Sequence, residues 1–177
     1  MEGRNGHFQP DEKVVYPQFG LGVVLEITHK EVDGGQESFY RLNFPVKQME
    51  ILVPVHRAEE NGLRKIMNGE QVQEVLDFMA EPKQCGRPQQ WHRWRKQALE
   101  QLKTGEPLLV ARIYCHLIGM ENSKGLSFTE RKILTQVEQM LVAEIAAAKK
   151  ISEEEALLLL TPTRKQAGME GESRIPA

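Results

Sequence analysis

The spacing of apolar residues in this 177-residue chain changes near residue 59. Before that point, apolar and polar residues alternate in short runs separated by Gly and Pro, which is typical of strands with one buried face. After it, apolar residues recur every three or four positions, as on amphipathic helices. We therefore expect two domains, a β domain over residues 1–66 and an all-α domain over residues 67–160, followed by a disordered tail over residues 161–177.

The first part predicts four or five short strands within about fifty residues. Asp33-Gly34-Gly35 is a strong hairpin turn, and the glycines of 18–22 favour a tight loop. This many short strands in so little sequence predicts a small SH3-like or Tudor-like β-barrel, so the whole chain is an α+β multidomain protein. The strands are expected at Lys13–Pro17, Val23–Val32, Ser38–Phe44 and Met49–Val55.

The second part predicts five helices, and two of them carry capping boxes. Ser127 with Glu130 opens a long helix that runs to Lys150, and Ser152 with Glu155 opens a short one over 153–160. The remaining helices are expected over Glu70–Met79, after Pro88, and from Pro107 to Met120, where Pro107 suits a first helical turn.

The helix after Pro88 lies in a basic segment, 87–103, that also holds both tryptophans. The segment has five cations and one acid, although the whole chain has a net charge of −2. On a helical projection Trp94, Ala98 and Leu102 share one face, so Trp94 is expected in the core. Trp91 lies on the same side but in the first turn, where a large ring can either cap the core or protrude. The five cations are Arg87, Arg93, Arg95, Lys96 and Lys103.

Charge and composition limit the partners and the location of the protein. Residues 81–112 carry seven cations against three acids, so a polyanion should contact the middle of the chain. No apolar run approaches the length of a membrane span, and the N-terminal residues lack the apolar core of a signal peptide. With only Cys85 and Cys115 and no export signal, we expect reduced thiols and a cytoplasmic protein without membrane contact.

The side chains that carry enzyme chemistry are scattered. Cys85 and His92, and the adjacent Cys115 and His116, match no common zinc spacing, so no metal or other cofactor is expected. Nucleotide-binding and nucleophile motifs are absent from the sequence, because the Gly-rich segment 19–22 is not followed by a helix. We expect no enzyme activity.

Four segments of the first part resemble the N-terminal domain of the CarD family, which is shared with the transcription-repair coupling factor. They are V-V-Y-P-Q-F-G-L-G-V-V-L-E-I (Val14–Ile27), F-Y-R-L-N-F (Phe39–Phe44), I-L-V-P-V (Ile51–Val55) and G-L-R (Gly62–Arg64). The later W-x-x-x-x-K (Trp91–Lys96) and L-S-F-T-E-R-K-I-L (Leu126–Leu134) are similar to the helical domain of that family. The coupling factor is a large helicase, and its ATPase motifs have no counterpart here.

The resemblance implies a bacterial transcription regulator that docks its β domain on the β subunit of RNA polymerase. We expect the protein to be a monomer. Its helical domain would contact promoter DNA at the upstream edge of the bubble and stabilise the open complex. The wedge tryptophan of the family matches Trp91, beside Arg87, Arg93, Arg95, Lys96 and Lys103. Basic docking positions of the family align with Lys30, which keeps the charge, and with Leu52, which does not. The leading candidate for the docking edge is the short apolar run that Pro54 ends, beside the strand of Lys30. The predicted docking edge therefore comprises Lys30, Met49, Glu50, Ile51, Leu52 and Val53.

Two alternatives remain open from the sequence. The chain could be an adaptor that links RNA polymerase to another protein and has no direct DNA role. It could also be a nucleic-acid-binding module that acts alone, although five cations on a slightly acidic protein predict only weak binding to free DNA.

Overall fold

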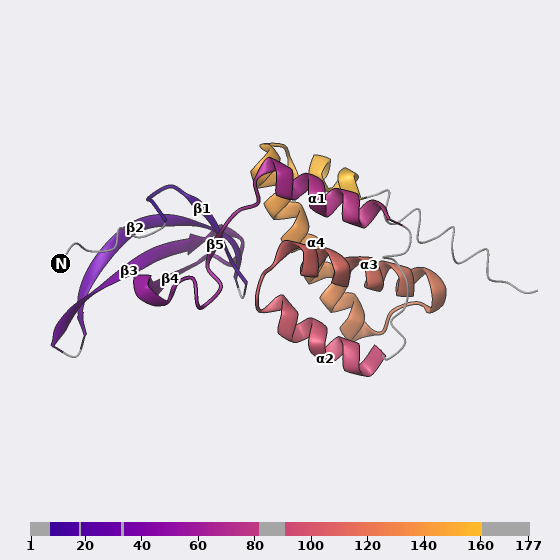
Figure 1. The fold of residues 1–177 in the computed structure, drawn as a ribbon, viewed down its shortest axis with the longest axis horizontal. Helices are drawn as coiled ribbons and strands as arrows, with labels where there is room; N and C mark the ends of the chain where they lie inside the picture. The colour runs from indigo at the N-terminus through magenta and orange to yellow at the C-terminus, as the bar shows by residue number, and fades with distance from the viewer. Residues whose placement is uncertain (1–7, 18, 33, 82–90, 161–177) are drawn as a thin grey trace, which may run out of the picture. The chain divides into compact units, whose positions relative to one another are not determined.

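A computed structural model describes residues 8–17, 19–32, 34–81 and 91–160. The chain divides into two compact units, residues 1–66 and residues 67–177. The first unit is an antiparallel sheet and the second is helical (Figure 1). The prediction of an α+β chain, with a small Tudor-like β domain followed by a helical domain, is therefore confirmed.

The first unit is a five-stranded antiparallel sheet with the order β4-β3-β2-β1-β5. The strand β2 is long, and with β3 it forms a curved hairpin (Figure 1). A register shift between Val24 and Glu26 bends β2, as a bulge does. In this sheet β4 pairs only with β3, and β5 only with β1, so both are edge strands. The strands are β1 (Lys13–Tyr16), β2 (Gly20–Val32), β3 (Gly35–Phe44), β4 (Met49–Pro54) and β5 (Arg64–Lys65).

The segment 20–22 was expected in a loop, but it begins β2 instead. The reason is a close contact that the sequence does not reveal. A Cβ on Gly22 would lie 2.6 Å from the ring of Phe44, so Gly22 lets two strands meet over this aromatic side chain. The β core around Phe44 also holds Tyr40 and Leu42, all at most 1% exposed.

The second unit contains α1 (Gly69–Ala80), α2 (Trp91–Leu102), α3 (Pro107–Lys124), α4 (Phe128–Lys149) and a helical segment over 153–160. Both predicted capping boxes are present. The hydroxyl of Ser127 accepts from the Glu130 amide at 3.3 Å, and the hydroxyl of Ser152 accepts from the Glu155 amide at 3.1 Å. The helix from Pro107 runs one turn beyond the predicted end, because Gly125 first supplies a positive φ of 77°.

The described residues of the helical unit form one core, built mainly on α3 and α4. The centre of α3 is buried on almost every side, including Tyr114 and Cys115 at 0% exposure. Helices α1, α2 and α4 all contact α3, which explains why an amphipathic stripe is weak in its sequence. The apolar stripe of α4 (Ile133, Leu134, Val137, Leu141 and Ile145) is buried in this core.

Candidate docking groove and basic helix

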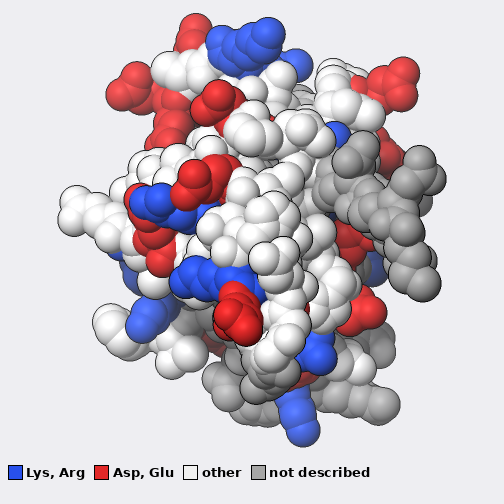
Figure 2. Space-filling model, turned by 90° about the vertical axis from the view of Figure 1, so that its left-hand side faces the viewer, with Lys and Arg blue, Asp and Glu red and all other residues white. Residues whose placement is uncertain are grey.

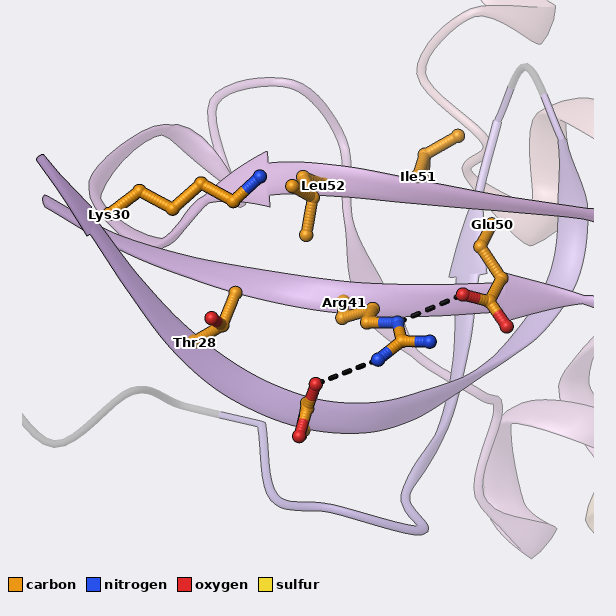
Figure 3. Close-up of a pocket in the computed structure, with 7 residues that line it drawn as sticks. Thr28, Lys30, Arg41, Glu50, Ile51 and Leu52 are labelled. Carbon is orange, nitrogen blue, oxygen red and sulfur yellow. Dashed lines mark hydrogen bonds and ion pairs between the residues drawn. The ribbon is translucent and has the colours of Figure 1, made fainter. Parts of the chain in front are cut away.

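A groove of about 380 Å³ lies on the face of the sheet formed by β2, β3 and β4 (Figure 3). It is central to the candidate site because four residues of the predicted docking edge line it. Residues of β2 enter it at every second position, as the alternation of a strand requires. The lining residues are Glu26, Thr28, Lys30, Arg41, Glu50, Ile51 and Leu52.

An arginine held between two carboxylates occupies one part of the groove. Arg41 on β3 donates from Nη1 to Glu26 and from Nε to Glu50, each at 2.9 Å (Figure 3). Hydrogen bonds to Glu26 and then to Glu50 raise the pKa of Arg41 above its ordinary value. The three charges sum to −1, so this part of the groove is weakly anionic even though an arginine lies at its centre.

The other part of the groove combines a cation with an apolar side chain. Lys30 is exposed, and Leu52 is 38% exposed. In Figure 3 the Lys30 side chain and Leu52 lie over the same groove, and Ile51 points from the other side of β4. The two positions aligned with basic docking residues of the family, Lys30 and Leu52, thus line one surface.

Strand β4 contributes the remaining predicted docking residues. Met49 is 36% exposed and Glu50 is exposed, whereas Val53 is 3% exposed and belongs to the β core. Only the main chain of Val53 is therefore available at the edge, and its side chain cannot be a docking contact. This follows from its pairing opposite Tyr40, which places both side chains on the buried face.

Sequence reasoning missed Arg41, Glu26 and Thr28. A usable signal was present, because Glu26, Thr28 and Lys30 alternate along one strand and share a face. The position of Arg41 opposite Glu26 required the bulge in β2, which the sequence does not reveal.

The charge distribution on the viewed face of the molecule is mixed. Figure 2 shows Lys and Arg side chains interspersed with Asp and Glu side chains there, without a continuous field of one sign. Such a surface favours recognition by paired charges over general attraction of a polyanion.

The basic helix α2 packs its predicted apolar face on the helical core. Ala98 and Leu102 are buried, and Trp94 is partly buried against the core with its ring edge-on to His116 at 5.1 Å. The placement of Trp94 against the core is therefore confirmed. The opposite face is exposed at Lys96, Glu100 and Lys103.

One of the predicted DNA contacts already has a partner. Lys103 lies just beyond the end of α2, and its Nζ is 3.0 Å from both carboxylate oxygens of Glu100. An exposed ion pair of this kind contributes little to stability, so a DNA phosphate can replace Glu100 as the partner of Lys103. Arg87 and the side chains of Trp91, Arg93 and Arg95 lie outside the described residues.

Two further features are absent from the part of the chain that the structure describes. No group of three or more His, Cys, Asp or Glu residues within it could hold a metal ion. Within the same residues, no helix is long and apolar enough to cross a membrane.

Comparison with known proteins explains why these two elements occur in one chain. Residues 8–67 match the CarD-like/TRCF RID domain, and residues 74–161 match the CarD C-terminal domain. The chain is also 23% identical over 148 residues to the "Putative transcription factor YdeB" of Bacillus subtilis (strain 168), covering 84% of this chain and 96% of that one. A CarD-like/TRCF RID domain indicates an interaction with RNA polymerase. The two domain matches, in this order and over most of the chain, show that it belongs to the CarD family of transcription factors.

Proposed function

We propose that this protein docks on the β subunit of RNA polymerase through the edge of β4 and stabilises the open promoter complex through α2. The observation that carries the proposal is the edge strand β4 beside the groove that contains Lys30 and Leu52. The proposal assigns one task to each unit, docking to residues 1–66 and DNA contact to residues 67–160.

An edge strand supplies most of what a docking site needs. The outer side of β4 has main-chain groups that pair with no strand of this sheet, and a partner strand can satisfy them. Main-chain hydrogen bonds give affinity but little selectivity. Selectivity must come from side chains next to the edge, and the groove provides them in Glu50 and Leu52.

The groove defines the chemistry of a matching partner surface. An apolar side chain can cover Leu52, and an acidic group can pair with Lys30. A basic group can approach Glu26 and Glu50, which outnumber the single charge of Arg41. Like-charge contacts in either half would be unfavourable, so the groove also selects the direction of the docked segment.

The DNA contact proposed for α2 rests on its composition and on the packing of its apolar face. Since Trp94, Ala98 and Leu102 hold the helix on the core, Lys96 remains exposed for a phosphate. Trp91 at the first turn is assigned as the wedge at the upstream edge of the bubble. Unstacking a base step that is already opening costs only a few kcal/mol.

No catalysis is needed for this function. A protein that contacts the open promoter complex but not the closed one shifts the equilibrium between them. The size of the shift is the difference between its binding free energies for the two states. A preference of about 1–3 kcal/mol changes the open-complex population about 5- to 150-fold. Weak DNA binding suffices, because docking on polymerase keeps α2 at a high effective concentration near the promoter.

The deciding experiment measures the lifetime of open complexes on one promoter with and without the full-length protein. The same preparation is tested for capture of a polymerase β fragment. The proposal expects longer lifetimes and capture of the fragment. Capture with no change in lifetime would instead favour an adaptor role, and a DNA shift without capture would favour a module that acts alone.

A further inference from the structure

We propose a second nucleic-acid contact at the beginning of α4, where Phe128 stacks on an unpaired base and Arg131 and Lys132 bind the flanking phosphates. This contact is separate from α2 and from the groove of the β domain. It adds a binding site to the proposed function without depending on polymerase docking.

The exposed ring is the first observation. Phe128 is 86% exposed, the highest value among the large apolar side chains of the described residues. It is the first residue of α4, directly after the N-cap Ser127. Ser127 and Glu130 form the capping box, so Phe128 has no part in it. The side chain of Phe128 also does not pack on the helical core. Neither the core nor the cap requires an aromatic ring here.

The second observation is a pair of cations on the same face. Arg131 and Lys132 lie three and four positions after Phe128, so all three side chains are neighbours on the helix surface. Both cations are exposed, and neither has an ion-pair partner among the described residues. Two exposed cations beside the exposed ring can pair with neighbouring phosphates of one bound strand.

The charges of the neighbouring residues in the chain indicate the kind of partner. From residue 122 to residue 136, the exposed side chains carry positive charge and no negative charge, because the one carboxylate, Glu130, is buried in its capping box. An apolar pocket on another protein would match Phe128 but would leave two cations unpaired. An unpaired nucleic-acid strand presents both a base face and adjacent phosphates, and aromatic stacking beside cations is how proteins bind single strands.

The test uses full-length protein and a fluorescein-labelled oligothymidylate that contains 5-iodouracil, at low salt. Irradiation should cross-link the protein to the oligonucleotide, and trypsin digestion should then place the cross-link in the peptide Gly125–Arg131. Phe128 is the only aromatic residue of this peptide. Phe128→Ala should weaken binding in anisotropy titrations by about 5- to 150-fold, as expected for the loss of one base–aromatic stack. Phe128→Trp should preserve both binding and the cross-link.

Two further variants and one control variant separate stacking and phosphate contact from general effects. Phe128→Leu keeps an apolar side chain but cannot stack, so it should behave like Phe128→Ala. Lys132→Gln should reduce the salt slope by about 0.7, the value for one phosphate contact on a single strand. Lys149→Gln makes the same charge change at the other exposed end of α4 and should leave the cross-link unchanged.

A cross-link absent from Gly125–Arg131 at saturating oligonucleotide would overturn the proposal. Full binding by Phe128→Leu would also overturn it, because a leucine side chain cannot stack on a base. Either result would leave docking through β4 intact, because the assay contains no polymerase. It would also leave the role of α2 intact, because none of these variants changes α2. Loss of capture of the β fragment would conversely leave this contact intact.

Discussion

The main-chain N–H of Met67 donates a hydrogen bond of 2.9 Å to Oε1 of Glu144, 77 positions further along the chain. Met67 lies next to Asn68, the N-cap of α1, and Glu144 belongs to α4. Glu144 is 5% exposed, so this buried hydrogen bond ties the start of the helical unit to α4.

The first prediction concerns this buried bond. Glu144→Leu leaves the Met67 amide without this acceptor, so the free energy of unfolding should fall by about 1–3 kcal/mol. Glu144→Gln retains an acceptor oxygen and should cost less. Urea unfolding followed by circular dichroism measures both. Equal destabilisation by the two variants would show that the negative charge matters and not the acceptor.

The second prediction concerns docking through the groove. Leu52→Asp places a carboxylate where the partner is proposed to bury an apolar contact, so binding to a polymerase β fragment should weaken by on the order of 30-fold or more. Val46→Asp is the matched control, because Val46 is 83% exposed and does not line the groove. Titration calorimetry measures the affinity of both variants for the β fragment. An equal loss of affinity in the two variants would show that the groove is not part of the docking surface.

The third prediction separates the two tryptophans. Trp94→Ala removes a ring that packs on the core and should lower the free energy of unfolding by about 3 kcal/mol. Trp91→Ala should leave stability and polymerase binding nearly unchanged, while open-complex lifetime falls about 5- to 150-fold. Thermal melts and lifetime assays measure the two effects. If Trp91→Ala melts the helical domain as severely as Trp94→Ala does, the wedge assignment is falsified.

The fourth prediction concerns DNA binding by α2. If Arg93, Arg95, Lys96 and Lys103 each neutralise one phosphate of duplex DNA, log K should fall against log salt with a slope of about −3 to −4. Glu100→Gln frees Lys103 from its ion pair and removes a nearby negative charge, so it should strengthen binding. Anisotropy titrations at several salt concentrations test both effects. A flat salt response would exclude these cations from the interface.

The fifth prediction concerns acid stability of the β domain. Burial acts to raise the pKa of Glu12, but hydrogen bonds from Lys65 and the Gln9 amide, with the charge of Lys65, outweigh it and lower the pKa below 4.5. The ion pair, with Nζ of Lys65 2.7 Å from Oε1 of Glu12, therefore stabilises the fold above about pH 4.5. This stabilisation is lost as the pH falls through the lowered pKa.

Because the Lys65 end of that pair is exposed, the effect should be small, on the order of 0.5 kcal/mol. Urea melts between pH 3 and pH 6 should show a steeper loss of stability for the natural protein than for Glu12→Gln. Parallel curves for the two proteins would contradict the prediction.

Local sequence determined the type and the ends of most elements. The capping boxes at Ser127 and Ser152 open helices where predicted, because their hydrogen bonds form between residues three positions apart. Pro107 starts α3 for an equally local reason, since its missing N–H costs nothing in a first turn. The apolar face of α2 follows from helical spacing alone, and Ala98 and Leu102 are buried as predicted.

Only the tertiary structure decided which side chains meet across the sheet. The bulge in β2 places Arg41 between Glu26 and Glu50, and no local pattern specifies that register. The burial of Val53 depends on its partner Tyr40 in β3, so the sequence of β4 alone could not exclude its side chain from docking. The spacing of apolar residues and helix capping depend on residues a few positions apart. Strand register and side-chain burial depend instead on residues brought together from distant parts of the chain.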